Sequence, residues 1–127
     1  MFDLQRFLEG LDLLYASGKG REAEDYLKRG LKEAAACGDD GSILAILNEL
    51  MGYYRAAGRH EECLLCARQA MELADELGLD GTVQYGTMLL NAATGYRAAG
   101  RYQEAERLYG QAYEIYRRYI SGPDYHM

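Results

Sequence analysis

Apolar residues recur every three or four positions through most of the chain, which is the period of an amphipathic helix and not of a strand. One apolar stripe contains four bulky residues, Leu47, Leu50, Met51 and Tyr54. A second stripe contains mostly small residues, Cys63, Cys66, Ala67, Ala70, Met71 and Ala74. Gly58 stands between the two stripes, so the pattern predicts a helix, a short glycine turn and a second helix.

This unit occurs three times. A glycine marks the turn of each copy, at Gly18, Gly58 and Gly100, with steps of 40 and 42 residues, and the letters YRAAGR occur in two of the copies. Glycine suits the left-handed conformation that ends a helix. Because one helix pair cannot bury both of its faces, stacked copies are needed to make a continuous core.

Two further columns of the repeat hold mostly small side chains. They are Ala23, Cys63 and Ala105, and Gly30, Ala70 and Ala112. A bulky side chain in these columns would hold neighbouring helices apart. We therefore expect the second helix of each unit to approach its neighbours closely there.

The stretch from 89 to 116, LLNAATGYRAAGRYQEAERLYGQAYEIY, resembles the tetratricopeptide repeat family, and most closely its long-repeat form, as in kinesin light chains. The matching positions are Tyr96, Gly100, Tyr102, Ala105, Tyr109 and Ala112 in this unit, Leu47, Tyr54, Gly58, Cys63 and Ala70 in the second, and Phe7, Leu14, Gly18, Ala23 and Gly30 in the first. The resemblance implies an all-α fold, with three tandem helix-turn-helix repeats in a right-handed α-solenoid.

We expect one domain over residues 1–120, with repeats at about 2–38, 42–79 and 82–120. The tail 121–127, SGPDYHM, falls where a fourth unit should begin. We therefore expect either a chain cut from a longer repeat array or an open end that is buried against another copy.

The last expected helix, 102–120, places Tyr109, Tyr113, Tyr116 and Ile120 on one side. Aromatic stripes at helical spacing usually belong to the core. Part of this stripe would nevertheless face a fourth unit, so the three tyrosines are also the expected surface for a homo-oligomer.

The composition of the chain limits the classes of partner and the compartment that we expect. A formal net charge of -6 argues against nucleic acid, which needs clustered Lys and Arg. The first helix carries charges from Asp3 to Asp12, and the chain has no long apolar run, so we expect neither a signal peptide nor a membrane segment. Together with three cysteines that form no framework, this favours the cytoplasm.

Catalytic chemistry is not apparent in the sequence. His60, Cys63 and Cys66 are spaced three residues apart, but zinc needs a fourth ligand, and Cys63 occupies a small-residue column. We interpret both cysteines as packing residues and expect no enzyme activity, no metal and no cofactor. A redox or metal-dependent activity through Cys63 and Cys66 is the enzyme alternative.

In the family, the first helix of each pair lines a groove that receives peptides or partner helices. Carrying over these positions gives Gln5, Leu8, Asp12 and Tyr15, then Ala45, Asn48, Gly52 and Arg55, then Thr87, Leu90, Thr94 and Arg97, flanked by Glu9, Glu49 and Asn91. The partner-binding candidates are Asp12, Tyr15, Asn48, Arg55, Asn91, Thr94 and Arg97.

Two features of this set indicate a ligand. Asn48 and Asn91 lie in the middle of helices, where their amides can bond the backbone of an extended partner. Arg55 and Arg97 occupy the same column of adjacent units and suit a carboxylate, unless nearby acids such as Asp12 neutralise them. We therefore expect a protein or peptide partner with an acidic group.

Two other functions fit the same sequence. The array would serve as the receptor part of a longer peptide-sensing regulator, or as a self-assembling scaffold that pairs through its tyrosine-rich end.

Overall fold

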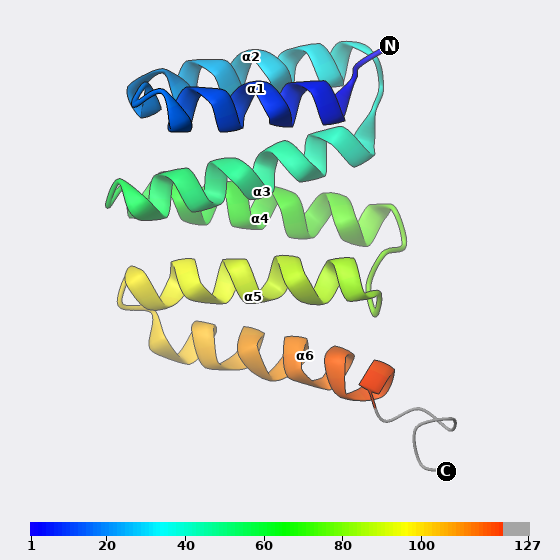
Figure 1. Ribbon diagram of the computed structural model, residues 1–127. Coiled ribbons are helices and arrows are strands. Elements are labelled where there is room, and N and C mark those ends of the chain that lie inside the picture. The colour runs from blue at the N-terminus through cyan, green and yellow to red at the C-terminus, as the bar shows by residue number, and fades with distance from the viewer. Residues whose placement is uncertain (121–127) are drawn as a thin grey trace.

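A computed structural model describes residues 1–120, and within this range the chain is all-helical (Figure 1). The elements are α1 (Leu4–Ala16), a 3-10 turn η1 (Gly20–Glu22), α2 (Ala23–Ala36), α3 (Asp40–Ala56), α4 (His60–Glu76), α5 (Val83–Ala98) and α6 (Tyr102–Ile120). Several helices begin after a residue whose side chain accepts a hydrogen bond from the first turn. Asp39, for example, accepts a hydrogen bond from the backbone N–H of Ser42 at the start of α3.

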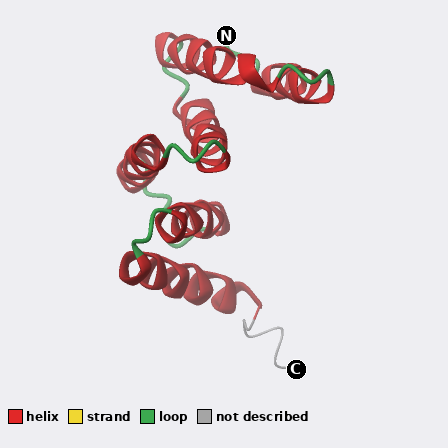
Figure 2. Ribbon diagram, turned by 90° about the vertical axis from the view of Figure 1, so that its left-hand side faces the viewer, coloured by secondary structure: helices red, strands yellow, loops and turns green. Residues whose placement is uncertain are grey.

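The helices form three successive pairs, and the pairs stack along one axis (Figures 1 and 2). Each second helix packs against the first helix of the next pair, α2 against α3 and α4 against α5. The first helices α3 and α5 also touch each other directly. The α-solenoid expected from the repeat is therefore confirmed.

The glycine turns have the expected backbone. Gly18, Gly58 and Gly100 have φ angles of 72, 74 and 81°. In each turn the residue after the glycine donates its N–H to a carbonyl near the end of the first helix, as Arg59 does to Tyr54 at 2.9 Å. These bonds satisfy carbonyls that the helix end would otherwise leave without partners.

The core is continuous through the stack and uses the two stripes predicted for the second unit, of which Met71 alone is only half-buried. The small side chains of these columns lie where neighbouring helices approach each other closely, since Ala23 and Cys63 are completely buried. A Cβ at Gly30 would collide with the ring of Phe7. The expected close packing of the second helices is confirmed.

The last helix differs from the expectation in one respect. Its buried stripe consists of Ala105, Leu108, Ala112 and Ile115. Tyr113 is 65% exposed, so its assignment to the core was wrong, because Tyr113 lies beyond the edge of the stripe that α5 covers. The tail 121–127, where we expect a fourth repeat to start, lies outside the described residues.

Candidate partner-binding groove

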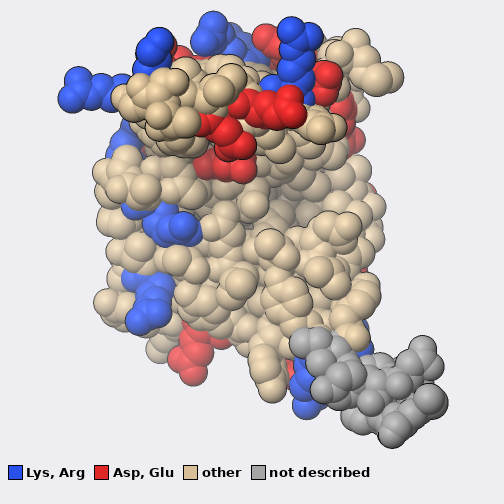
Figure 3. Space-filling view, in the orientation of Figure 1, with Lys and Arg blue, Asp and Glu red and all other residues tan. Residues whose placement is uncertain are grey.

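The first helices α1, α3 and α5 present one face of the solenoid, which we call the groove face (Figure 1). Acidic side chains gather in the upper part of this face, and Lys and Arg side chains lie across the top of the molecule and down its left-hand side (Figure 3). Most of the surface between these charges is uncharged.

Three of the candidate residues form one hydrogen-bond network between α3 and α5. Asn91 donates its Nδ2 to Asn48 Oδ1 at 2.8 Å and to the Asn48 carbonyl at 3.2 Å. Arg55 donates Nη1 to Asn91 Oδ1 at 2.7 Å. The structure thus brings Asn48, Asn91 and Arg55 together, and part of their hydrogen-bonding capacity fastens two repeats to each other.

Hydroxyl groups on α5 are engaged in a similar way with α6. Thr94 Oγ1 donates to the Leu90 carbonyl at 2.9 Å and lies 3.1 Å from Tyr109 OH. Thr87 Oγ1 lies 2.7 Å from Tyr116 OH. Both tyrosines are half-buried, so this edge of α6 continues the groove face of α5.

The remaining candidates, Asp12, Tyr15 and Arg97, are exposed. Within residues 1–120, neither Arg55 nor Arg97 forms an ion pair with an acid. No nearby carboxylate neutralises Arg55, because its guanidinium donates to the neutral amide of Asn91 instead. Both arginines keep their charge on the groove face.

The acidic part of the groove lies where α1 meets α3. Burial raises the pKa of Glu49, and the nearby charge of Asp12 raises it further. Burial also raises the pKa of Tyr15, with a contribution from Glu49. Two carboxylates therefore share this end of the groove with an aromatic side chain.

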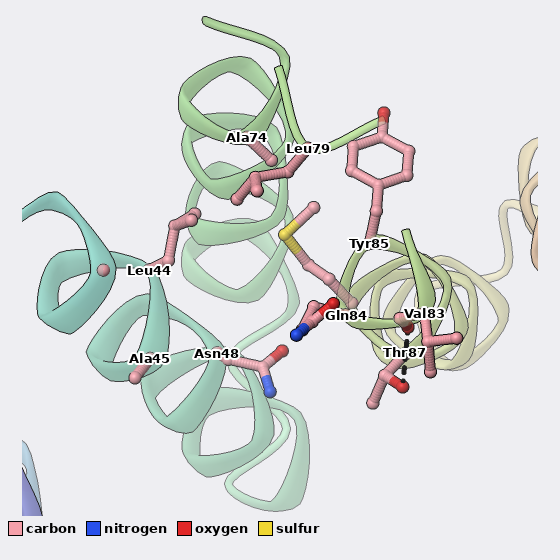
Figure 4. A pocket seen from close by; sticks show the side chains of 11 residues that line it. Leu44, Ala45, Asn48, Ala74, Leu79, Val83, Gln84, Tyr85 and Thr87 are labelled. Carbon is pink, nitrogen blue, oxygen red and sulfur yellow. Dashed lines mark hydrogen bonds between the residues drawn. The ribbon is translucent and has the colours of Figure 1, made fainter. Parts of the chain in front are cut away.

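Sequence reasoning missed an apolar pocket between α3 and α5, which has a volume of about 570 Å³ (Figure 4). It is lined by α3, α4, the loop between α4 and α5, and the first turns of α5, through Gly41, Leu44, Ala45, Asn48, Ala74, Leu79, Val83, Gln84, Tyr85, Thr87 and Met88. Three of the carried-over groove positions, Ala45, Asn48 and Thr87, lie in this lining, and Asn48 is the one partner-binding candidate among them. The small column residue Ala45 was the available signal, but the loop that closes the pocket does not follow from the repeat pattern.

The cysteines occupy the core. Cys63 is fully buried and Cys66 is 7% exposed. Burial raises the pKa of both thiols, that of Cys66 to about 11. A thiol with a raised pKa is a poor nucleophile, which agrees with a packing role. In the described part of the chain, no three His, Cys, Asp or Glu residues converge as a metal site would require.

None of the helices described between residues 1 and 120 has the length and apolar character needed to cross a membrane. No curated protein is similar to the chain by sequence. One solved structure that resembles it is the crystal structure of BtubC (BKLC) from P. vanneervenii, with 23% sequence identity and a TM-score of 0.78. The match covers 90% of this chain and 46% of that one, so this chain spans about half the length of its structural neighbour.

The family model described as tetratricopeptide repeat matches residues 42–118, which is more than half of the chain. The matched region covers all but the outermost residues of the second and third helix pairs, together with the turns at Gly58 and Gly100. The resemblance seen in the sequence is therefore confirmed, and the chain belongs to the tetratricopeptide repeat family.

Proposed function

We propose that this chain is a non-enzymatic interaction module that binds a protein or peptide partner on the groove face. Proteins of this family generally serve as protein interaction modules and as non-catalytic scaffolds. The observation that carries the proposal for this chain is the groove face itself. It combines an apolar pocket, exposed apolar side chains and unpaired charges on three stacked helices.

The exposed apolar residues support binding because their burial would be favourable. Leu90 is 41% exposed, Tyr15 is 46% exposed and Val83 is 37% exposed, each on a first helix. An apolar surface next to polar groups is typical of sites that a partner covers. Leu90 and Val83 on α5 are close enough in sequence to act on one partner segment.

The arginines support an acidic group in that partner. Arg97 is exposed. The guanidinium of Arg55 donates one of its five N–H groups to Asn91, and this bond holds it in place. The other donors of Arg55 face no acid among the described residues. A partner carboxylate on this wall would gain a charge-assisted hydrogen bond.

The test compares capture of proteins by groove variants and by matched variants elsewhere. Leu90→Asp and Arg97→Glu change the groove face. Leu65→Asp and Arg68→Glu change exposed side chains on α4, where Leu65 is 49% exposed. After circular dichroism shows that all four fold, we expect the first two to lose the partner and the α4 pair to keep it. Equal capture by all four would show that the groove face is not the binding surface.

A second function, self-association, is favoured by α6. Of the three tyrosines expected to pair copies, Tyr113 is 65% exposed, whereas Tyr109 and Tyr116 are half-buried against α5. Tyr102 and Tyr119 on the same helix are 67 and 60% exposed. We expect light scattering to show a mass that rises with concentration, and Tyr113→Asp to reduce it. A monomer at every concentration would leave the groove proposal standing alone. Use of the groove as the receptor part of a longer peptide-sensing regulator stays a prediction.

A further inference from the structure

The pocket between α3 and α5 has an uncharged and mostly apolar lining. None of the residues that line it is charged, and its walls are formed by Leu44, Leu79, Val83 and Met88. Its volume of about 570 Å³ falls within the range of sites that hold small ligands or anchoring side chains. Ala45 belongs to the lining, so a larger residue at this position would take up part of the pocket.

Two amide side chains belong to the lining of the pocket. Asn48 and Gln84 belong to its lining from opposite sides, α3 and α5 (Figure 4). Asn91 fixes the orientation of Asn48 by donating to its Oδ1. The Asn48 Nδ2 has no hydrogen-bond acceptor within residues 1–120, so it remains available to a partner carbonyl. An apolar cavity with a fixed amide beside it suits a peptide segment, because the cavity takes the side chain and the amide takes the backbone.

The charge beside the pocket is negative. Glu49 directly follows Asn48 on α3, and its carboxyl group feels the charge of Asp12 from α1. No cation forms an ion pair with either acid in the described part of the chain. A partner that carried an acid here would be repelled, whereas a basic side chain would relieve the repulsion between the two carboxylates.

We infer that the pocket receives an apolar side chain of a peptide segment whose lysine or arginine, a few residues away, faces Asp12 and Glu49. Asn48 and Glu49 are consecutive on α3. We therefore expect about two to four extended residues between the apolar side chain in the pocket and the basic side chain that faces Glu49. This inference rests on the proposed function and specifies its partner.

The experiment selects binders from a displayed library of short random peptides with the wild-type chain. We expect the enriched peptides to share an apolar side chain with a lysine or arginine two to four residues from it. Ala45→Trp, which fills the pocket, should weaken their binding about tenfold or more, as loss of a central anchor does. Ala35→Trp adds the same bulk to an exposed site on α2 and should leave binding unchanged.

The charge is tested with Glu49→Gln, which should weaken binding about threefold, in keeping with an exposed ion pair. Glu72→Gln, at an exposed position of α4, is its matched control. Because a tryptophan in the groove can disturb the fold, the pocket is also probed in the wild-type chain. Addition of an enriched peptide should shift the methyl NMR signal of Met88.

The outcomes separate this inference from the proposed function. Peptides that leave Met88 unshifted and tolerate Ala45→Trp, but lose binding with Arg97→Glu, overturn the pocket and keep the groove. Peptides that need the pocket but carry acids beside the anchor overturn the basic partner. If no peptide is enriched, the inference fails, and the capture experiment with Leu90→Asp and Arg97→Glu decides the proposed function by itself.

Discussion

The two junctions between repeats are held by different chemistry. At the first junction, Glu24 of α2 accepts from Arg59 at 2.6 and 3.0 Å and from the hydroxyl of Tyr54 at 2.8 Å, and it forms an ion pair with Lys28. The Arg59 guanidinium also lies over the Tyr54 ring. At the second junction, α5 packs so closely on α4 that only glycine fits at position 95, and neutral amides add the bond between Asn91 and Asn48.

This difference shows that one repeated scaffold can be joined by charge or by shape. A junction made by charge responds to pH and salt, whereas a junction made by close packing responds to the volume of a single side chain. In a solenoid each repeat contacts only its neighbours, so damage at one junction should be felt first in the repeats beside it. The predictions below test this division.

The largest effect is expected at Gly95. A Cβ there would lie 2.7 Å from the buried Sγ of Cys63, so Gly95→Ala should lower the free energy of unfolding by about 2 kcal/mol, as overpacking does. Denaturant unfolding followed by circular dichroism measures the change. Combined with Cys63→Ala, which makes room, the same substitution should become far less harmful.

Gly52 of α3 is the matched control, because a Cβ there would meet no atom within 4 Å. Gly52→Ala should raise the free energy of unfolding by about 0.5 to 1 kcal/mol through helix propensity alone. If the two glycine substitutions change stability in the same direction, shape does not hold the second junction.

At the first junction, Glu24→Gln should lower the free energy of unfolding by about 1.5 kcal/mol. The substitution keeps the size of the side chain but removes its charge from Arg59 and Lys28, and the discount for partial exposure is already included. Hydrogen exchange should accelerate in α1 and α2 before α6. Uniform acceleration along the whole chain would contradict a local charged junction.

The amide network at the second junction is expected to contribute less. Asn91→Ala removes the partner of Asn48 and Arg55, and should cost about 1 kcal/mol because both groups can turn to water. The thermal midpoint measures this effect. Gln84→Ala, which removes an exposed amide from the same helix, is the control and should leave the midpoint nearly unchanged. Equal losses in the two variants would mean that the network adds nothing to the junction.

The helices could be predicted from the sequence, because the apolar period and the glycine turns are properties of one repeat copied three times. Tyr113 escaped this reasoning, since helical spacing shows that it lies near the stripe of α6 but not how far α5 extends over it. Helix type is a local property of the chain. Coverage by a neighbouring helix is not.

The candidate groove could be predicted only as a set of columns. Asn48 and Asn91 lie in the expected columns, yet a column cannot show that their amides bond to each other across two repeats. The pocket beside them depends on where Leu79 of the loop lies relative to α3 and α5, and no repeat position specifies that loop. Junctions and pockets arise between units, which a pattern within one unit does not describe.

The smallest effects concern pH, and they should have opposite signs at two acids. The bonds from Arg59 lower the pKa of Glu24 from 4.5 to about 2. The contribution of Glu24 to the free energy of unfolding is therefore complete above its ordinary pKa, and it is lost as the pH falls through the lowered pKa. Burial and Asp12 instead raise the pKa of Glu49, so the folded state binds a proton more readily there than the unfolded chain does. Stability from this group therefore falls as the pH rises through its ordinary range.

Glu49→Gln should accordingly stabilise the fold at neutral pH by less than about 0.5 kcal/mol, because Glu49 is only partly buried and water screens its carboxylate. Unfolding curves are measured between pH 3 and pH 7, a range that brackets ordinary carboxyl pKa values of roughly 4. With Glu24→Gln, the free energy of unfolding should fall less steeply as the pH is lowered. With Glu49→Gln, the free energy of unfolding should rise slightly near pH 7. A fall in neutral stability with Glu49→Gln would mean that the acid pair stabilises the fold, and it would remove the electrostatic reason to expect a basic partner beside the pocket.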